Sequence, residues 1–304
     1  MGMTKEDEWP LLRSGEWSAT RETLQLWTQV VGKVRLALSP MVNHWWEVPF
    51  YVSARGLNTS PIPCEGGIFD VEFDFVDHKL RIEKSDGSTC ATALEPRSVA
   101  DFYAEVMSLL KSMDIDVKIW PMPVEIPNPV RFDQDRAHCS YDPEYARRFW
   151  RVLISCGKIF QEFRGRFIGK SSPVHFFWGS FDLAVTRFSG RRAPERPNAD
   201  RITREAYSHE VISAGFWPGS GEMDAAFYAY AAPEPGGFKE GPVRPNAAFY
   251  SPQMSEYFLM YEDLRKASSP REYLTEFLQS TYDKAATLGN WDREALERPR
   301  ATHA

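Results

Sequence analysis

A strict alternation of apolar and acidic side chains constrains the fold of this chain more than any other feature. The apolar members are Phe69, Val71, Phe73 and Phe75, and the acidic members between them are Asp70, Glu72 and Asp74. A period of two residues is typical of a β-strand that has one face in the core and the other toward solvent. The segment therefore predicts a half-buried strand.

The next two segments extend this strand into a meander. KLRIEK follows a reversal near Asp77, and TCATAL follows a turn at 85–87. Both segments are short and bounded by turn residues, which predicts three antiparallel strands. Lys79, Arg81 and Lys84 would then lie opposite the acidic row, so we interpret that row as cross-strand ion partners rather than as a metal site.

Helical patterns surround these strands. Apolar residues repeat at helical spacing over 21–38, and a second helix is expected from Ser98, where Asp101 three residues later resembles a capping box. Asp142 and Pro143 are the residue types of an N-cap and a first helical position, which predicts a third helix. Helices combined with antiparallel strands indicate an α+β fold.

The second half of the chain resembles the first. VNHWW in the first half and VHFFW in the second each follow a helix that contains Gly-Lys, and SVADFYAEVMSLL aligns without gaps on SPREYLTEFLQST. The similarity predicts an internal duplication, with two helix/antiparallel-sheet/helix units packed about a pseudo-twofold axis. We expect an N-terminal unit over 1–120, a proline-rich connector over 121–142 and a C-terminal unit with loop insertions over 143–304.

Composition and charge limit the class of protein. The 304 residues are 43% hydrophobic and 26% charged, which is typical of a globular protein and excludes disorder. The net charge is −6, yet the segment 143–206 holds thirteen Lys or Arg against six Asp or Glu. That local excess favours a small anionic ligand, whereas the acidic total argues against a nucleic-acid partner.

A cytoplasmic location is expected, with no membrane partner. The chain has no run of roughly 18 consecutive apolar residues, and its start, MGMTKEDEWP, is acidic where a signal peptide would be basic and then apolar. The four cysteines, at 64, 90, 139 and 156, lack the spacing of a metal knuckle or of a compact disulfide framework. We interpret them as reduced thiols.

Histidines are the main candidates for chemistry, because the chain has no P-loop, dinucleotide, nucleophile-elbow or zinc-protease motif. His175 and His209 together with Asp182 match the ligand set of a facial-triad metal site, with Glu210 as the alternate carboxylate. His175 and Asp182 are seven residues apart, so along one strand they would share a face only if a bulge intervened near Gly179.

Three interpretations of this set stay open. The residues could hold a divalent metal such as iron or zinc, act as acid–base groups without a metal, or be structural. Arg187 and Arg166 are the preferred anchors of an anionic ligand, because a guanidinium can hold a carboxylate or phosphate through two parallel bonds. The predicted substrate-binding set also includes Trp178 and His44, which is the counterpart of His175 in the first half. The aromatic run around Trp178 is also typical of a hydrophobic core.

Several long segments resemble a family of bacterial proteins that carries a domain-of-unknown-function label. The segments include TLQLWTQVVGKVRLALSPMVNHWWEVPFYVSARGL, FDFVDHKLRI, SPVHFFWGSFDLAVTRFSGRR and REAYSHEVISAGFWPG. The resemblance runs from Trp9 to about Trp291. It implies one architecture along the chain, and it brings no activity, cofactor or catalytic residue.

Two functional hypotheses follow. In the first, the protein is an enzyme that acts on a small anionic or aromatic metabolite in a cleft between the two units, with or without a metal. In the second, it is a non-catalytic protein that binds a small molecule or a protein partner, including a second copy of itself in a homodimer.

Overall fold

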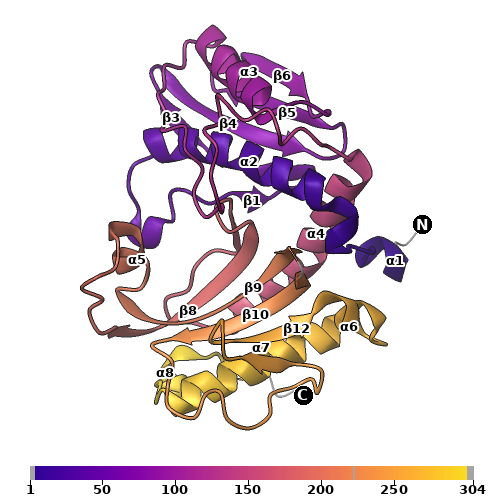
Figure 1. The fold of residues 1–304 in the computed structure, drawn as a ribbon. Coiled ribbons are helices and arrows are strands. Elements are labelled where there is room, and N and C mark those ends of the chain that lie inside the picture. Colours follow the sequence, from indigo (N-terminus) through magenta and orange to yellow (C-terminus); the bar gives the residue numbers. More distant parts are fainter. Residues whose placement is uncertain (1–3, 222, 300–304) are drawn as a thin grey trace.

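Two antiparallel sheets and the helices around them make up the computed structural model, which describes residues 4–221 and 223–299 (Figure 1). The expected α+β class is confirmed. The elements of the first half are α1 (Lys5–Glu8), α2 (Ser14–Leu38), the 3-10 turn η1 (Asn43–Trp45), β1 (Tyr51–Val52), β2 (Gly56–Asn58), β3 (Ile62–Cys64), β4 (Gly67–Asp74), β5 (Lys79–Lys84), β6 (Thr89–Ala93) and α3 (Val99–Ser112).

The second half begins after a segment without regular structure. Its elements are α4 (Pro143–Gly165), β7 (His175–Phe177), β8 (Asp182–Arg192), α5 (Arg201–Ala206), β9 (His209–Ser220), β10 (Met223–Ala232), β11 (Phe249–Ser251), β12 (Glu256–Met260), α6 (Tyr261–Lys266), α7 (Pro270–Leu288) and α8 (Arg293–Leu296). Within the described ranges, no helix is of a length and hydropathy that would cross a membrane.

The first sheet has the strand order β1-β2-β4-β5-β6, with β3 paired to β4. Its β4–β5–β6 part is the predicted meander, and the apolar members of the alternation are buried. Of the three predicted basic partners, Arg81 pairs with the acidic row, whereas Lys84 pairs with Asp86. The Asp74 carboxylate accepts hydrogen bonds from Arg81 Nε at 2.8 Å and from Arg55 Nε, which was not predicted, at 2.7 Å. Asp74 is thereby paired although its side chain is fully buried.

Helix boundaries follow the predicted caps. The Ser98 hydroxyl accepts a hydrogen bond from the backbone N–H of Asp101 at the start of α3. The Asp142 carboxylate accepts two backbone N–H groups at the start of α4, and Pro143 occupies the first turn. Each cap provides partners for N–H groups that the helix itself leaves unpaired.

Helix α2 lies between the two sheets, where its neighbours bury most of its residues (Figure 1). Its polar side chains are bonded to the proline-rich segment and to the second half. The Gln25 amide donates to the carbonyl of Gly179 at 2.7 Å, and Gln29 exchanges two hydrogen bonds with the backbone of Val124 at 2.8 and 2.9 Å. Because a buried amide needs partners, these bonds fix both segments against α2.

The second sheet has the strand order β11-β12-β10-β9-β8-β7. Strands β7 and β8 form a hairpin, in which His175 lies opposite Ala184 and Phe177 lies opposite Asp182. We expected His175 and Asp182 on one strand with a bulge near Gly179, and that expectation is wrong. Residues 178–181 instead form the turn, where Phe181 has a φ of 62° and its N–H donates to the carbonyl of Phe177.

The structure does not confirm the predicted duplication, because the strand orders of the two sheets do not correspond one to one. The two halves are nevertheless joined by a shared core and by backbone hydrogen bonds. One cluster of buried apolar side chains extends through both. Phe50, before β1, and Phe176, in β7, exchange two backbone hydrogen bonds of 2.8 and 2.7 Å. The duplication therefore stays a prediction, whereas the shared core is observed.

Candidate functional site

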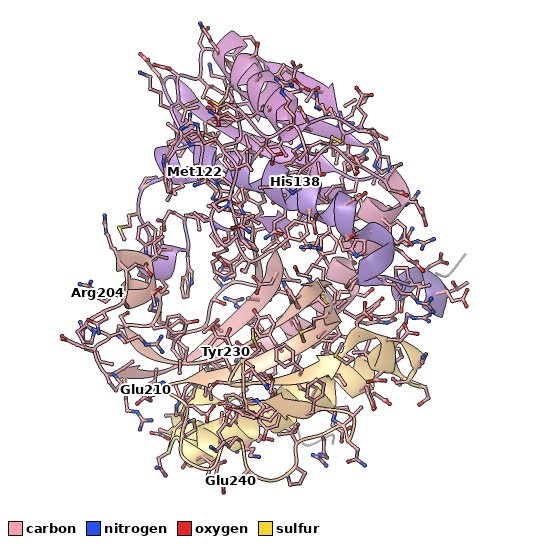
Figure 2. The ribbon with its side chains drawn as sticks, in the orientation of Figure 1. Met122, His138, Arg204, Glu210, Tyr230 and Glu240 are labelled. Carbon is pink, nitrogen blue, oxygen red and sulfur yellow. The ribbon has the colours of Figure 1, made fainter. Side chains whose placement is uncertain are left out.

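The two faces of the second sheet differ in chemistry. One face is apolar and packs against α4, α6 and α7. The other face carries polar and aromatic side chains, and we call it the polar face. Its members in the register of the sheet are Asp182, Thr186 and Phe188 of β8, Ser213 of β9, Tyr228 and Tyr230 of β10, and Glu256 of β12. Figure 2 labels Tyr230 near the middle of this sheet. Because Thr186, Tyr228, Tyr230 and Glu256 keep partial exposure, water reaches this face.

Asp182 is buried at one end of the polar face. Its two oxygens accept hydrogen bonds from the hydroxyls of Ser180 and Tyr228. The Tyr228 ring crosses β9 at Gly215, where an added Cβ would lie 2.4 Å from atoms of the ring. Gly215 therefore permits the contact between β10 and β8. Burial raises the pKa of Asp182, which these hydroxyl donors oppose in part.

Two more carboxyl groups lie near Asp182, and they come from separate segments of the chain. Glu256 starts β12, and burial followed by the charge of Asp182 raises its pKa to about 7. Glu125 lies in the proline-rich segment with a φ of 55°, and the same two causes raise its pKa. Within the described residues, neither Glu125 nor Glu256 forms a salt bridge. The end of the polar face around Asp182 therefore holds three carboxyl groups whose pKa is raised above the usual value of a carboxylic acid.

Hydroxyl groups occupy the middle of the polar face. The rings of Tyr228 and Tyr230 stack with centroids 6.2 Å apart, and the Tyr230 hydroxyl lies 3.0 Å from that of Tyr207. Thr186 and Ser213, which are cross-strand partners, bring their hydroxyls to 2.9 Å. Hydroxyls both donate and accept, so this region suits a polar ligand.

The other end of the polar face is basic. Lys170 Nζ lies 2.6 Å from His44 Nε2, and the His44 Nδ1 atom lies 3.1 Å from the carbonyl oxygen of Glu205 and 3.2 Å from that of Ala206. A carbonyl only accepts, so Nδ1 carries the hydrogen and Nε2 accepts from the ammonium group. The same ammonium lies 4.8 Å from the centre of the Phe188 ring. Two protein groups thus hold Lys170 in place.

His209 joins this end of the face from β9. Its ring centroid lies 5.7 Å from that of His44, and it pairs in the sheet with Arg192. Burial, then the charges of Lys170 and Arg192, lower the pKa of His209. We call His44, Lys170 and His209 the basic cluster. No salt bridge of Lys170 with a carboxylate occurs within residues 4–221 and 223–299, so its charge has no counterion there.

His175 lies beside the basic cluster and is almost completely buried. Its ring packs 4.6 Å from Phe177 and 6.2 Å from Trp46, which also contacts His44 at 5.2 Å. Burial, assisted by the charges of Arg35 and Arg164, lowers the pKa of His175 to about 3. The Nδ1 atom of His175 has no hydrogen-bond partner among the described residues. His175 is therefore a neutral imidazole enclosed by aromatic rings.

The predicted anion anchor Arg187 lies on the opposite, apolar face of the sheet. Its guanidinium carbon lies 3.4 Å from the centre of the Phe163 ring and 4.2 Å from that of Tyr282, and its Nη2 donates to the carbonyl of Phe163. Strand alternation places Arg187 and Thr186 on different faces. The prediction that Arg187 anchors a ligand beside the histidines is therefore corrected.

The remaining predicted residues have other roles or positions. Arg166 is exposed just after α4. Trp178 packs on Gly32 and donates from Nε1 to the carbonyl of Val48 at 2.8 Å, which is a core contact. Glu210 lies at the end of β9 on the face opposite His209 and pairs with Arg191 at 2.7 Å (Figure 2).

The predicted metal ligands do not converge. In the part of the chain that the structure describes, no three His, Cys, Asp or Glu side chains are grouped in a way that could hold a metal ion. His175 is enclosed by rings, His209 lies in the basic cluster, and Asp182 is bonded to two hydroxyls. The three residues share a sheet face without sharing a centre.

Sequence reasoning missed several residues that define this site. Glu125 and Glu256 gave no signal, and Lys170 was only one of many basic residues in its segment. A two-residue alternation over 228–230 is present in the sequence and could have placed the tyrosines on one face. The contact of Lys170 with His44 spans 126 residues, and no local pattern reports it.

Comparison with known proteins gives a family without an assigned activity. The sequence model of a family described as "Family of unknown function (DUF5996)" matches residues 9–298. No curated protein and no solved structure matches the chain.

Proposed function

The chain belongs to the family of unknown function DUF5996, and we propose that it is an enzyme that acts on a small anionic metabolite at the polar face of the second sheet. One observation carries this proposal. A single, partly water-accessible face holds, at one end, a basic cluster whose Lys170 has no counterion among the described residues, and at the other end carboxyl groups with raised pKa. Charges and perturbed groups of this kind cost stability and are typical of functional sites.

Each part of the face has a proposed role. The basic cluster holds the anionic group of the metabolite, and the buried ring of Phe188 supports Lys170 from the sheet. Glu256 is the proposed acid–base group, because a pKa near 7 lets it exchange a proton at neutral pH. Tyr228, which is partly exposed, orients the ligand, and the charge of Asp182 raises the pKa of Glu256. The proposal depends neither on the predicted duplication nor on iron or zinc.

Binding of phenyl phosphate and benzoate tests the proposal, with benzyl alcohol as the uncharged analogue. We expect both anions to bind and the alcohol to bind at least about tenfold more weakly, because a charge-assisted hydrogen bond contributes about 1.5–3 kcal/mol. Lys170→Gln should weaken anion binding by a similar factor. Lys158→Gln, which removes an exposed lysine of α4, is the matched control and should bind as the parent does. Equal binding of the anions and the alcohol would contradict the proposal.

A second candidate function is a protein-interaction role, including a homodimer. It is favoured by the apolar side chains Met41, Val42 and Ile202, which are exposed near the junction of η1 and α5. Light scattering over a concentration series tests this candidate. A mass that rises with concentration in the parent and stays monomeric in Ile202→Asp would support it, whereas a monomer throughout would remove the homodimer.

A further inference from the structure

We infer that Lys170 is a nucleophile and His44 is its base, and that Lys170 condenses with the aldehyde or ketone group of an anionic substrate to form a Schiff base. The inference rests on the proposed function, since it names the substrate class of the same site. It goes further by assigning a covalent step and a catalytic residue.

The geometry of His44 supports the role of a base. Its Nδ1–H is held by the carbonyls of Glu205 and Ala206 at the end of α5, and the lone pair of Nε2 points to the Lys170 ammonium 2.6 Å away. When Nε2 takes a proton from Lys170, both ring nitrogens carry hydrogens, and both keep acceptors. The lysine is left as a free amine. This arrangement of nucleophile, base and a third orienting group is typical of covalent catalysis.

The surroundings of Lys170 favour the free amine. The rings of Phe188 and Trp46, 4.8 and 5.4 Å from Nζ, hold the Lys170 side chain beside His44, and the titratable groups across the cluster, His209 and Arg192, are basic, so no carboxylate there stabilises the ammonium. Removal from water lowers the pKa of Lys170, and burial followed by the charge of Lys170 lowers that of His44. The Lys170 side chain is nevertheless exposed, so a substrate can reach it.

The proposed step balances without an oxidant or reductant. The Lys170 ammonium gives one proton to His44 Nε2, and the Nζ lone pair forms a bond to the carbonyl carbon. The carbonyl oxygen takes up that proton and one further proton from nitrogen, its bond to carbon breaks, and it leaves as water. Ammonium and carbonyl thus become a protonated imine and water, and the positive charge is conserved. His209 and Arg192 stay available for the anionic group of the substrate.

Reductive trapping tests this step directly. The intact protein is incubated with glyoxylate, an anionic aldehyde, and cyanoborohydride, and labelled lysines are identified by peptide mass spectrometry. At pH 7 we expect Lys170 to be labelled faster than the exposed Lys266, because a lowered pKa leaves more free amine and His44 removes the proton from the remaining ammonium. Propionaldehyde, which is uncharged, should lose most of this preference.

Two variants separate the roles. Lys170→Arg keeps the charge and removes the nucleophile, so labelling at this position should vanish. His44→Asn keeps a donor toward the carbonyls and removes the base. Asparagine also tolerates the left-handed backbone of residue 44, where φ is 60°. We expect labelling of Lys170 in this variant to fall by about tenfold at pH 7. Labelling equal to that of the parent would overturn the inference.

The parent protein alone provides a further test if the His44 variant does not fold. Labelling of an ordinary lysine rises about tenfold per pH unit from 7 to 9, because the amine fraction does so. Labelling of Lys170 should rise less steeply, and a rate equal to that of Lys266 at every pH would overturn the inference. If Lys170 were labelled at the rate of Lys266 and the parent protein still bound phenyl phosphate, the Schiff-base inference would fail and the proposed function would stand. If the parent protein also failed to bind phenyl phosphate, the proposed function would fail as well.

Discussion

Two buried carboxyl groups, Asp74 and Glu256, have pKa values shifted in opposite directions. Burial by itself would raise the pKa of Asp74, but hydrogen bonds from Arg55, from backbone N–H groups and from Arg81 lower it to about 2. Glu256 has no such donors among the described residues, and burial with the charge of Asp182 raises its pKa to about 7. The local hydrogen bonds of each residue therefore decide the sign of its effect on stability.

Glu256→Gln should stabilise the protein at pH 8 and leave it nearly unchanged at pH 4. The folded Glu256 has a pKa of about 7, whereas an unfolded glutamate has one of about 4.3, so folding favours the protonated form. Its contribution to stability is present below about pH 4 and is lost as the pH rises to about 7. We expect a gain of roughly 2 kcal/mol at pH 8, measured by urea unfolding.

Asp74→Asn is the matched control, because its pH dependence has the opposite sign. The low pKa of Asp74 makes its stabilisation full above about pH 4 and lost as the pH falls toward about 2. The variant should lose about 2 kcal/mol at pH 7 and approach the parent near pH 2. A stability difference from the parent that changed with pH in the same direction for both variants would contradict our description of these two sites.

Gly215→Ala should disrupt the acidic end of the polar face. The new Cβ would lie 2.4 Å from Tyr228 and 2.6 Å from the carbonyl oxygen of Leu183, so the ring must leave Asp182. We expect a loss of about 1–3 kcal/mol in thermal or urea unfolding. Gly15→Ala is the control, because nothing lies within 4 Å of the added Cβ there. If both variants were equally stable, the close approach at Gly215 would be refuted.

At the scale of elements, α2 positions the proline-rich segment that carries Glu125. The Gln29 side chain holds that segment by two hydrogen bonds to Val124, one residue before Glu125. Gln29→Ala should release the segment, raise hydrogen exchange of its backbone amides and lower the free energy of unfolding by about 2 kcal/mol. Unchanged exchange would show that the prolines alone fix this segment. Gln161→Ala, at an exposed position of α4, should leave exchange there unchanged.

At the scale of the whole molecule, the two halves are expected to unfold together. Buried apolar side chains form one cluster through both halves, and Phe50 and Phe176 join the halves by backbone hydrogen bonds. Thermal unfolding followed by tryptophan fluorescence and by circular dichroism should give one coincident transition. The isolated segment 143–304 should show no cooperative transition. Two separate transitions would instead support independent domains.

Local patterns allowed much of the fold to be predicted. The meander, the long helices and the caps at Ser98 and Asp142 depend on residues a few positions apart, and the structure contains each of them. The predicted strand through His175 and Asp182 failed, because four turn residues and a short hairpin leave no periodic signal. The hairpin brings His175 and Asp182 to one face without the expected bulge, and His209 joins that face from β9, yet the three residues do not form a single centre.

Local sequence patterns specify the α+β class, the long helices, the meander and the side chains that alternate along its strands. Long-range packing decides which face of the second sheet the helices cover, and so places Arg187 among aromatic rings and Thr186 on the accessible side. It also brings Lys170 to His44 across 126 residues. The physical reason is that alternation fixes the two faces of a strand relative to each other, whereas burial is decided by distant segments that pack on them.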